Sequence, residues 1–304
     1  MTSSPLVVSA ASLMALASSV VVLGCEGSPG SGSCQGSGCV EPEPCPDRNP
    51  LRNPYVGELH AHTAYSYDSI LAGVTAGPRD MYRFAQGESI RLPPVAPESA
   101  QRTTRLRRRL DFAAATDHAE FFGEFRVCTV PGYDGFDSDF CERYREQIEV
   151  GQDADRVLPP EAPLPKVFVD ISLLLAEENP TRFPLCGTND EDCTAKTSVV
   201  WEDEQAAAEE FYDRCTFTTF AAYEWTGNPA SANIHRNVIF RNDVVPELPT
   251  SYIEAPTPQQ LWSALDSQCL NGVPGCDVLA IPHSSNFSQG LMFEPTNADG
   301  SALS

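Results

Sequence analysis

Short apolar runs that end in polar clusters recur along this chain. Four of them are YVGELHAHT (55–63), LDFAAATDH (110–118), CTFTTFAAYEW (215–225) and VLAIPHSSN (278–286). Apolar, aromatic and β-branched runs of about four to eight residues, bounded by polar residues, predict strands. NIHRNVIFRN (233–242) has the same character and predicts a further strand.

Helical patterns alternate with these strands. PRDMYRFAQGE (78–88) and EDEQAAAEEFYDRC (202–215), which is dense in Ala and Glu, predict helices. A third predicted helix follows Thr257, with Thr257 as N-cap, Pro258 in the first turn and Gln260 at the third position. Alternating strands and helices predict an α/β domain with a largely parallel sheet.

The N-terminal part of the chain predicts export. Residues 1–24 contain the apolar segment 6–23 and predict a signal peptide. Cys25, directly after Leu-Gly, resembles the lipidation site of bacterial lipoproteins, which predicts a lipid anchor at Cys25 in the periplasm or on the cell surface. No Lys or Arg precedes Arg48, so an uncleaved anchor helix is the alternative. Residues 25–52, rich in Gly, Ser and Pro, predict a tether.

The cysteine content agrees with an oxidising compartment. The chain has 11 cysteines, and several form close pairs: Cys128 and Cys141, Cys186 and Cys193, and Cys269 and Cys276. Such pairs around turn sequences predict local disulfides. A zinc site built from cysteines is the weaker alternative, because the chain contains no C-x-x-C. Two pairs fall in residues 121–200, where several prolines predict a loop-rich insertion.

The charge balance excludes one class of partner. The chain has 20 basic and 42 acidic residues, a formal net charge of -22 at pH 7. We therefore expect no nucleic-acid partner. A small phosphorylated or ester substrate stays compatible, because a metal ion or local cations such as Arg79, Arg126 and Arg236 override the global field. The basic run at 105–109 has the character of a solvated helix end.

All five histidines lie in polar clusters next to predicted strands. His60 and His62 end the first strand, His118 the second and His283 the last, whereas His235 follows the run that carries Glu224. The strands of a barrel present their carboxyl ends at one face, so these imidazoles are predicted to meet there. Imidazole together with Asp and Glu suits Zn, Mn or Fe.

The spacing within the clusters indicates which side chains reach a shared cation. His60 and His62 are two residues apart on a strand and point to one face, as a pair of ligands would. Asp117 is either a ligand beside His118 or the carboxylate that orients it. Glu224 follows an apolar run in which a lone carboxylate is costly, which favours a metal-bridging role; a salt-bridged strand end is the alternative.

Taken in order, these motifs resemble those of a known superfamily. GELHAHTAYSYDS, DFAAATDHAEFFGE, TTFAAYEWTG with NIHRNVIF, and IPHSSN are similar to motifs of the polymerase-and-histidinol-phosphatase (PHP) superfamily. They resemble its family called domain of unknown function 3604 more closely, and there DMYRFAQGE matches too. The resemblance implies a distorted TIM-like (β/α)7 barrel over residues 53–304 that binds two or three divalent transition metals, Zn, Mn or Fe. Most characterised members hydrolyse phosphate esters.

Carried over residue by residue, the resemblance implies a ligand set for these metals. The set is His60, His62, Asp68, His118, Glu224, His235 and His283. The resemblance also implies catalytic roles for Asp117, beside the second-motif ligand, and for Glu224 as the bridging carboxylate. The implied reaction is attack of a metal-activated hydroxide on phosphorus.

One motif of the superfamily is absent. PHP sites end in a D-x-H near the last strand, whereas this chain contains no D-x-H and continues for only 21 residues after His283 (304 minus 283). We therefore expect a barrel and a metal site that are incomplete at the C-terminus. Either the chain is a fragment of a longer product or it is a decayed homologue, and hydrolysis is expected of the full-length parent.

Three functions are compatible with the sequence. The first is a metal-dependent hydrolase, of phosphoesterase type. The second is a non-catalytic cell-surface module that uses the metal as a scaffold. The third is an amidohydrolase-like enzyme that cleaves C–N bonds. It is disfavoured because such sites usually place a lysine inside the barrel, and Lys166 and Lys196 lie in loop-like sequence.

Overall fold

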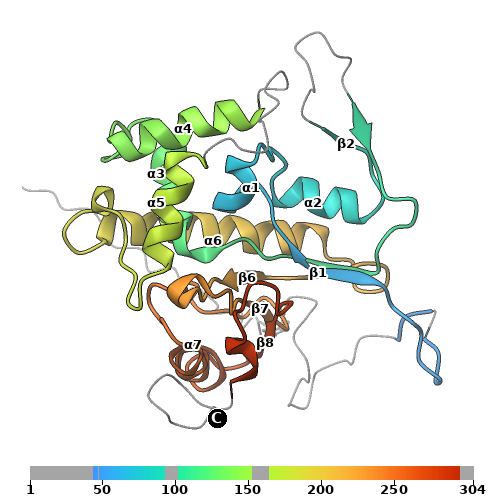
Figure 1. Cartoon of the computed structure of the whole chain (residues 1–304). Coiled ribbons are helices and arrows are strands. Elements are labelled where there is room, and N and C mark those ends of the chain that lie inside the picture. The colour runs from blue at the N-terminus through green and yellow to red at the C-terminus, as the bar shows by residue number, and fades with distance from the viewer. Residues whose placement is uncertain (1–43, 47, 93–101, 153–163, 295–304) are drawn as a thin grey trace, which may run out of the picture.

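The structure of the chain is a computed structural model that describes residues 44–46, 48–92, 102–152 and 164–294 (Figure 1). The predicted signal peptide, Cys25 and most of the predicted tether lie outside the described residues. None of the helices in the described ranges combines the length and apolarity needed to cross a bilayer.

Six strands form two small sheets that adjoin each other. The first sheet is parallel and has the order β1 (Gly57–Ala61), β4 (Phe112–Ala115), β5 (Thr218–Phe220). The second is antiparallel and has the order β6 (Ala222–Trp225), β7 (Arg236–Phe240), β8 (Val278–Pro282). The sheets are joined because only Ala221 separates β5 from β6, and His118 after β4 forms a parallel bridge with Glu224 in β6. A separate two-stranded hairpin pairs β2 (Ile90–Arg91) with β3 (Thr103–Thr104).

The directions of these strands confirm an α/β fold and correct the prediction of a largely parallel sheet. Strand β8 is antiparallel to β7 and therefore runs in the direction of β6, which leaves β7 as the one reversed strand of the six. The connection 226–235 between β6 and β7 is too short for the crossover of a dozen or more residues that a parallel pair needs. No pairing joins β1 to β8, so the described strands form no closed barrel.

Seven α-helices cover the strands in the described part of the chain. They are α1 (Tyr67–Leu71), α2 (Pro78–Ala85), α3 (Phe122–Thr129), α4 (Asp139–Gln152), α5 (Lys166–Leu175), α6 (Glu191–Phe211) and α7 (Pro258–Leu265). Short helical turns add η1 (Ala119–Phe121), η2 (Pro184–Cys186), η3 (Pro229–Ser231), η4 (Asp266–Leu270) and η5 (Leu291–Phe293). Figure 1 shows α1 to α5 gathered on one side of the long helix α6, with α7 and β6–β8 on the other.

The segment 121–200, which the sequence predicts to be loop rich, is largely helical where it is described. It contains α3, α4, α5 and the first part of α6. The prolines in the described part of this segment lie outside its α-helices; Pro131 follows α3 and Pro165 is the N-cap residue of α5. Proline therefore marks helix ends here, where its missing N–H costs least.

Small side chains in β4 allow close packing on both faces of the strand. Ala113 and Ala115 are buried against Tyr82 of α2 and Ala207 of α6. Ala114 points to the other face, where it packs with Ala222 and Ile239 of the second sheet. Successive side chains of β4 point to opposite faces, so one set packs against the helices and the other against the second sheet.

Four disulfides cross-link the described residues. Three are the local pairs predicted from the spacing, Cys128–Cys141, Cys186–Cys193 and Cys269–Cys276. The fourth, Cys45–Cys215, joins residues 170 positions apart and holds the N-terminal segment against the turn between α6 and β5. Several disulfides in one chain indicate an extracytoplasmic protein.

Candidate metal centre

All five histidines and Glu224 lie at one edge of the two sheets. The residues at this edge are His60 and His62 at the end of β1, His118 after β4, Glu224 in β6, His235 before β7 and His283 after β8. Since β7 runs in the opposite direction, the residue before its first position lies at the edge where the other strands end. Strand direction therefore explains how side chains from five segments converge.

Glu224 occupies the centre of this cluster. Its side chain is fully buried, and its Oε2 lies 2.7 Å from His62 Nε2 and 3.2 Å from His60 Nε2. Its Oε1 lies 2.9 Å from His235 Nδ1 and 3.6 Å from His283 Nε2. His118 Nδ1 also lies 3.8 Å from Oε2. The two carboxylate oxygens thus face different imidazoles, as expected of a carboxylate shared between two cations.

Asp68, in the first turn of α1, extends the cluster to one side. Its Oδ1 lies 3.1 Å from His62 Nδ1 and its Oδ2 lies 3.8 Å from His118 Nε2. Within this cluster, three groups have ligand atoms within 4.8 Å of one another: His60 with His62 and Glu224, His62 with Asp68 and His118, and His118 with Glu224 and His235. Asp68 is placed either to hold a cation or to orient His62.

The donor set fits divalent metal ions. The Nε2 atom of His235 is buried and has no hydrogen-bond partner among the described residues. The Nε2 atoms of His60 and His62 lie only 3.1 Å apart, and both face Glu224. Several imidazole nitrogens thus surround a buried carboxylate, and one of these nitrogens has no hydrogen-bond partner among the described residues. Zn, Mn and Fe accept nitrogen and oxygen ligands of this kind, so a bound ion would supply the missing partner.

Burial and charge shift the pKa values of the cluster in opposite directions. Burial lowers the pKa of His62, but Asp68 and Glu224 outweigh burial and raise this pKa to about 10. Burial lowers the pKa of His118 to about 3. Burial also raises the pKa of Glu224, but the neighbouring imidazoles, His118 first, hold it well below its usual range. At neutral pH in the metal-free cluster, His62 is therefore in its cationic form and His118 is neutral.

Asp117 lies outside the three groups of ligand atoms. Its carboxylate accepts hydrogen bonds from the Thr63 backbone N–H and, at 2.6 Å, from the Thr63 hydroxyl. It also contacts Glu204 of α6, whose pKa is raised well above its usual range by burial and then by Asp117. The hydrogen bonds of Asp117 thus connect the loop after β1 to the end of β4. Its carboxylate has its hydrogen-bond partners away from the cluster.

Two functional candidates were not predicted from the sequence, Thr226 and Glu120. The Nδ1 atom of His118 lies 2.7 Å from the Thr226 hydroxyl oxygen, which in turn hydrogen-bonds to Glu120. Glu120 is fully buried and accepts two backbone N–H bonds, from Thr226 at 2.9 Å and Tyr252 at 2.8 Å. The signal for Glu120 is its place in the apolar segment 119–125, where a carboxylate must find buried partners.

The three arginines considered as phosphate-binding cations differ in their contacts. Arg79 is paired with two carboxylates of α6, Asp203 at 2.9 Å and Glu210 at 2.7 Å. Arg126 lines a pocket of about 390 Å³ between α3 and α6. Arg236 donates to the carbonyl oxygen of His235 at 3.0 Å, which places it next to the cluster.

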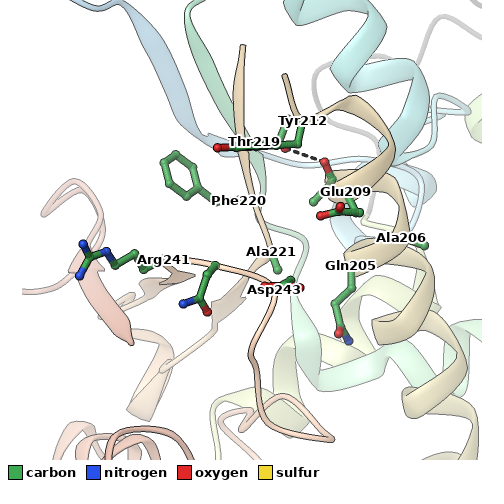
Figure 2. A pocket seen from close by; sticks show the side chains of 11 residues that line it. Gln205, Ala206, Glu209, Tyr212, Thr219, Phe220, Ala221, Arg241 and Asp243 are labelled. Carbon is green, nitrogen blue, oxygen red and sulfur yellow. Dashed lines mark hydrogen bonds between the residues drawn. The ribbon is translucent and has the colours of Figure 1, made fainter. Parts of the chain in front are cut away.

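A pocket of about 240 Å³ lies at the other end of the β6–β7 ladder (Figure 2). Its lining comes from three segments and includes Gln205 and Glu209 of α6, Phe220 and Ala221, and Arg241 and Asp243 after β7. In the ladder Ala222 pairs with Ile239, whereas Glu224 pairs with Asn237 next to the cluster. The pocket is therefore distinct from the candidate metal centre.

Comparison with known proteins identifies a family. No curated protein and no solved structure matches the chain. The chain belongs to the family described as protein of unknown function (DUF3604), which matches residues 49–304.

Proposed function

We propose that this protein is a metal-dependent hydrolase of PHP type that acts on phosphate esters. The observation that carries the proposal is the position of Glu224. Its carboxylate is fully buried and is flanked on both oxygens by imidazoles from separate segments. Burying a carboxylate among several titratable groups is costly unless cations compensate.

The proposed ligands are the six residues at the sheet edge together with Asp68. They are His60, His62, Asp68, His118, Glu224, His235 and His283. When bound, divalent cations supply Lewis acidity, which lowers the pKa of water at the site and polarises the oxygens of a phosphate ester. The chain itself contributes the orientation of these donors, and for Asp117 we propose a positioning role through Thr63 instead of a direct catalytic one.

Solvent exposure supports one direction of substrate approach. The side chain of His60 is 40% exposed, whereas those of His118 and Glu224 are 5% and 0% exposed. A substrate therefore reaches the cluster where His60 and Asp68 are open to solvent, since their side chains, at 40% and 39%, are the most exposed of the proposed ligands. Arg236 is the cation beside this cluster whose described contacts are carbonyl oxygens, which leaves its charge available to a phosphate.

The proposal includes a fold and a location. The order and common direction of β1, β4, β6 and β8 support membership of these strands in a distorted (β/α)7 barrel. The four disulfides support export, and we propose that Cys25 carries the lipid anchor.

The test begins with metal content. The chain is purified, supplied with Zn²⁺, Mn²⁺ or Fe²⁺, and analysed by mass spectrometry of the bound metals. Glu224→Ala and His235→Asn should lose bound metal, whereas Asp277→Asn, which affects an exposed pair with Arg241, should keep it. A wild-type protein that binds no metal under these conditions would refute the proposal.

Turnover then separates the candidate functions. Phosphomonoesters and phosphodiesters are assayed beside amides and cyclic amides with the same metals. Phosphoester hydrolysis that disappears in His118→Asn supports the proposal. Turnover confined to amides would favour a C–N hydrolase, and bound metal without turnover of any substrate would favour a non-catalytic module.

A further inference from the structure

We propose that Thr226 and Glu120 are positioning residues that hold the His118 imidazole in the tautomer with its proton on Nδ1 and its lone pair on Nε2. The consequence for metal binding rests on the proposed function, because it takes Nε2 as the donor to a cation. The tautomer itself is a property of the metal-free chain.

The three side chains form a continuous buried line. His118 is 5%, Thr226 1% and Glu120 0% exposed, so water has little access to compete for their hydrogen bonds. His118 Nδ1 lies 2.7 Å from the Thr226 hydroxyl oxygen, and this hydroxyl is hydrogen-bonded to Glu120 Oε2. The Thr226 hydroxyl is therefore the single link between the imidazole and the carboxylate.

The direction of these hydrogen bonds follows from the number of protons. A threonine hydroxyl has one proton to donate, and an ionised carboxylate can only accept. When Glu120 takes the hydroxyl proton, the Thr226 oxygen offers only a lone pair to His118. The Nδ1 atom must then carry the proton, which leaves Nε2 free.

The contacts around Glu120 favour this direction over its reverse. Its Oε1 accepts hydrogen bonds from the backbone N–H groups of Thr226 and Tyr252, so Oε1 acts as an acceptor and carries no proton. The remaining oxygen, Oε2, faces the Thr226 hydroxyl. Burial raises the pKa of Glu120, and the hydrogen bonds from the Thr226 hydroxyl and the two backbone N–H groups oppose this rise by stabilising the ionised form. In the reverse arrangement, Glu120 would donate to Thr226, and Thr226 would donate to His118 Nδ1.

The free nitrogen points to the ligands. His118 Nε2 lies 3.8 Å from Asp68 Oδ2, and His118 belongs with Asp68 and His62 to one of the groups that can hold an ion. His118 Nδ1 lies equally far, 3.8 Å, from Glu224 Oε2, but its nearest partner is the Thr226 hydroxyl at 2.7 Å. Imidazole ligands commonly donate their other N–H to a fixed acceptor, which sets the tautomer. Here the acceptor is a threonine hydroxyl that a buried glutamate polarises.

Two substitutions separate this role from general support of the fold. In Glu120→Gln the amide oxygen would remain opposite the two backbone N–H groups, and the amide NH₂ would face Thr226. The hydroxyl would then donate to His118 and force the proton to Nε2. Thr226→Val removes the link without changing the volume greatly, and Thr226→Ser restores the hydroxyl.

The first measurement is the ring ¹⁵N chemical shifts of the metal-free protein labelled at histidine. The chain has five histidines, and the signals lost in His118→Asn identify His118. Wild type and Thr226→Ser should show a protonated Nδ1, and Glu120→Gln should show a protonated Nε2. A wild-type protein with the His118 proton on Nε2 would overturn the inference, and so would an unchanged tautomer in Glu120→Gln. If a variant does not fold, the wild-type spectrum alone still tests the tautomer.

The second measurement is Zn²⁺ affinity by competition with a chelating dye. Glu120→Gln and Thr226→Val should bind Zn²⁺ about 10-fold more weakly or worse, and Thr226→Ser within about twofold of wild type. Thr197→Val is the matched control, since its hydroxyl is buried and hydrogen-bonded elsewhere, to the carbonyl oxygen of Cys193. Unchanged affinity in Glu120→Gln would reject the role. A wild type that binds no Zn²⁺ would instead count against the proposed function, with the tautomer still measurable.

Discussion

His62 and Glu224 lie 162 positions apart in the sequence, yet His62 Nε2 is 2.7 Å from Glu224 Oε2. The contact exists because β1 pairs in parallel with β4, and β6, which follows β5 after Ala221, forms a parallel bridge with His118 just beyond β4. The carboxyl ends of β1 and β6 therefore lie at the same edge. The pair is buried on the Glu224 side and carries opposite charges in the metal-free protein. The charge distribution of the centre therefore depends on how the two strands are placed by the fold.

Replacing Glu224 should affect metal binding more than any change outside the cluster. Glu224→Gln keeps the shape but removes the charge that both pairs of imidazoles face. We expect a loss of affinity larger than the about 10–100-fold typical of outer partners of metal ligands. Equilibrium dialysis with Zn²⁺ measures the effect, and a Glu224→Gln protein with wild-type stoichiometry and affinity would show that Glu224 binds no metal.

The stability of the metal-free protein should fall in alkaline solution. The pKa of His62 is raised from 6.5 to about 10 on folding, so its contribution is complete below pH 6.5 and is lost as pH rises to about 10. The contribution is on the order of a few kcal/mol. The pKa values of Asp68 and Glu224 are lowered, so their contributions are lost in acid. The pKa of His118 is lowered to about 3, so the unfolded chain gains a proton there as pH falls below 6.5 and the folded chain does not. Denaturant unfolding in chelator should therefore show greatest stability near pH 6.5.

Two controls test the origin of this pH dependence. His62→Asn should flatten the alkaline decline, because the titrating group is gone. Excess Zn²⁺ should reverse the trend above pH 6.5, because an imidazole must release its proton to bind a cation. A decline of equal size in wild type and His62→Asn would assign the effect to other groups.

The long-range disulfide should stabilise the protein more than the local ones. Cys45–Cys215 closes a loop of 170 residues, whereas Cys269–Cys276 closes one of 7. Because the entropy removed from the unfolded chain grows with loop length, Cys45→Ser with Cys215→Ser should cost about 2–5 kcal/mol. Urea unfolding of this double variant beside Cys269→Ser with Cys276→Ser gives the comparison. A larger loss in the short-loop variant would contradict the prediction.

The packing of α3 on α6 depends on Gly123. A Cβ atom added at Gly123 would lie 2.2 Å from the carbonyl oxygen of Cys193, a backbone atom at the start of α6. Gly123→Ala should therefore force the helices apart and cost about 1–3 kcal/mol. Gly132→Ala is not a clean control because its φ is positive, so Gly77→Ala, where the added atom meets nothing within 4 Å, serves instead. Thermal unfolding midpoints of both variants give the measurement.

The start of α7 offers a test of a sequence-level prediction. The Thr257 hydroxyl oxygen accepts the Gln260 backbone N–H at 3.3 Å, as the predicted N-cap requires. Thr257→Ala should cost about 1 kcal/mol, and Thr257→Ser should recover most of it. Equal stability of the alanine and serine variants in urea would show that the cap contributes nothing.

Much of the local structure was predictable because it depends on neighbouring residues. The strand runs, the helix after Thr257 and the three local disulfides follow from patterns within a few residues of each other. The convergence of the histidines was also predictable, since each lies next to a strand and parallel strands end at one edge. The α/β class followed from the alternation of these elements.

The tertiary structure decided what depends on distant segments. The reversal of β7 brings His235 to the cluster from the start of a strand, and the Cys45–Cys215 bond joins segments that no spacing connects. The assignment of neighbouring acids was decided in the same way, since Asp117 turns to Thr63 while Glu120, three positions later, supports His118 through Thr226. Local sequence sets the period and the type of an element. Only the packing of elements decides which buried polar group each side chain meets, because that depends on contacts across more than 100 positions.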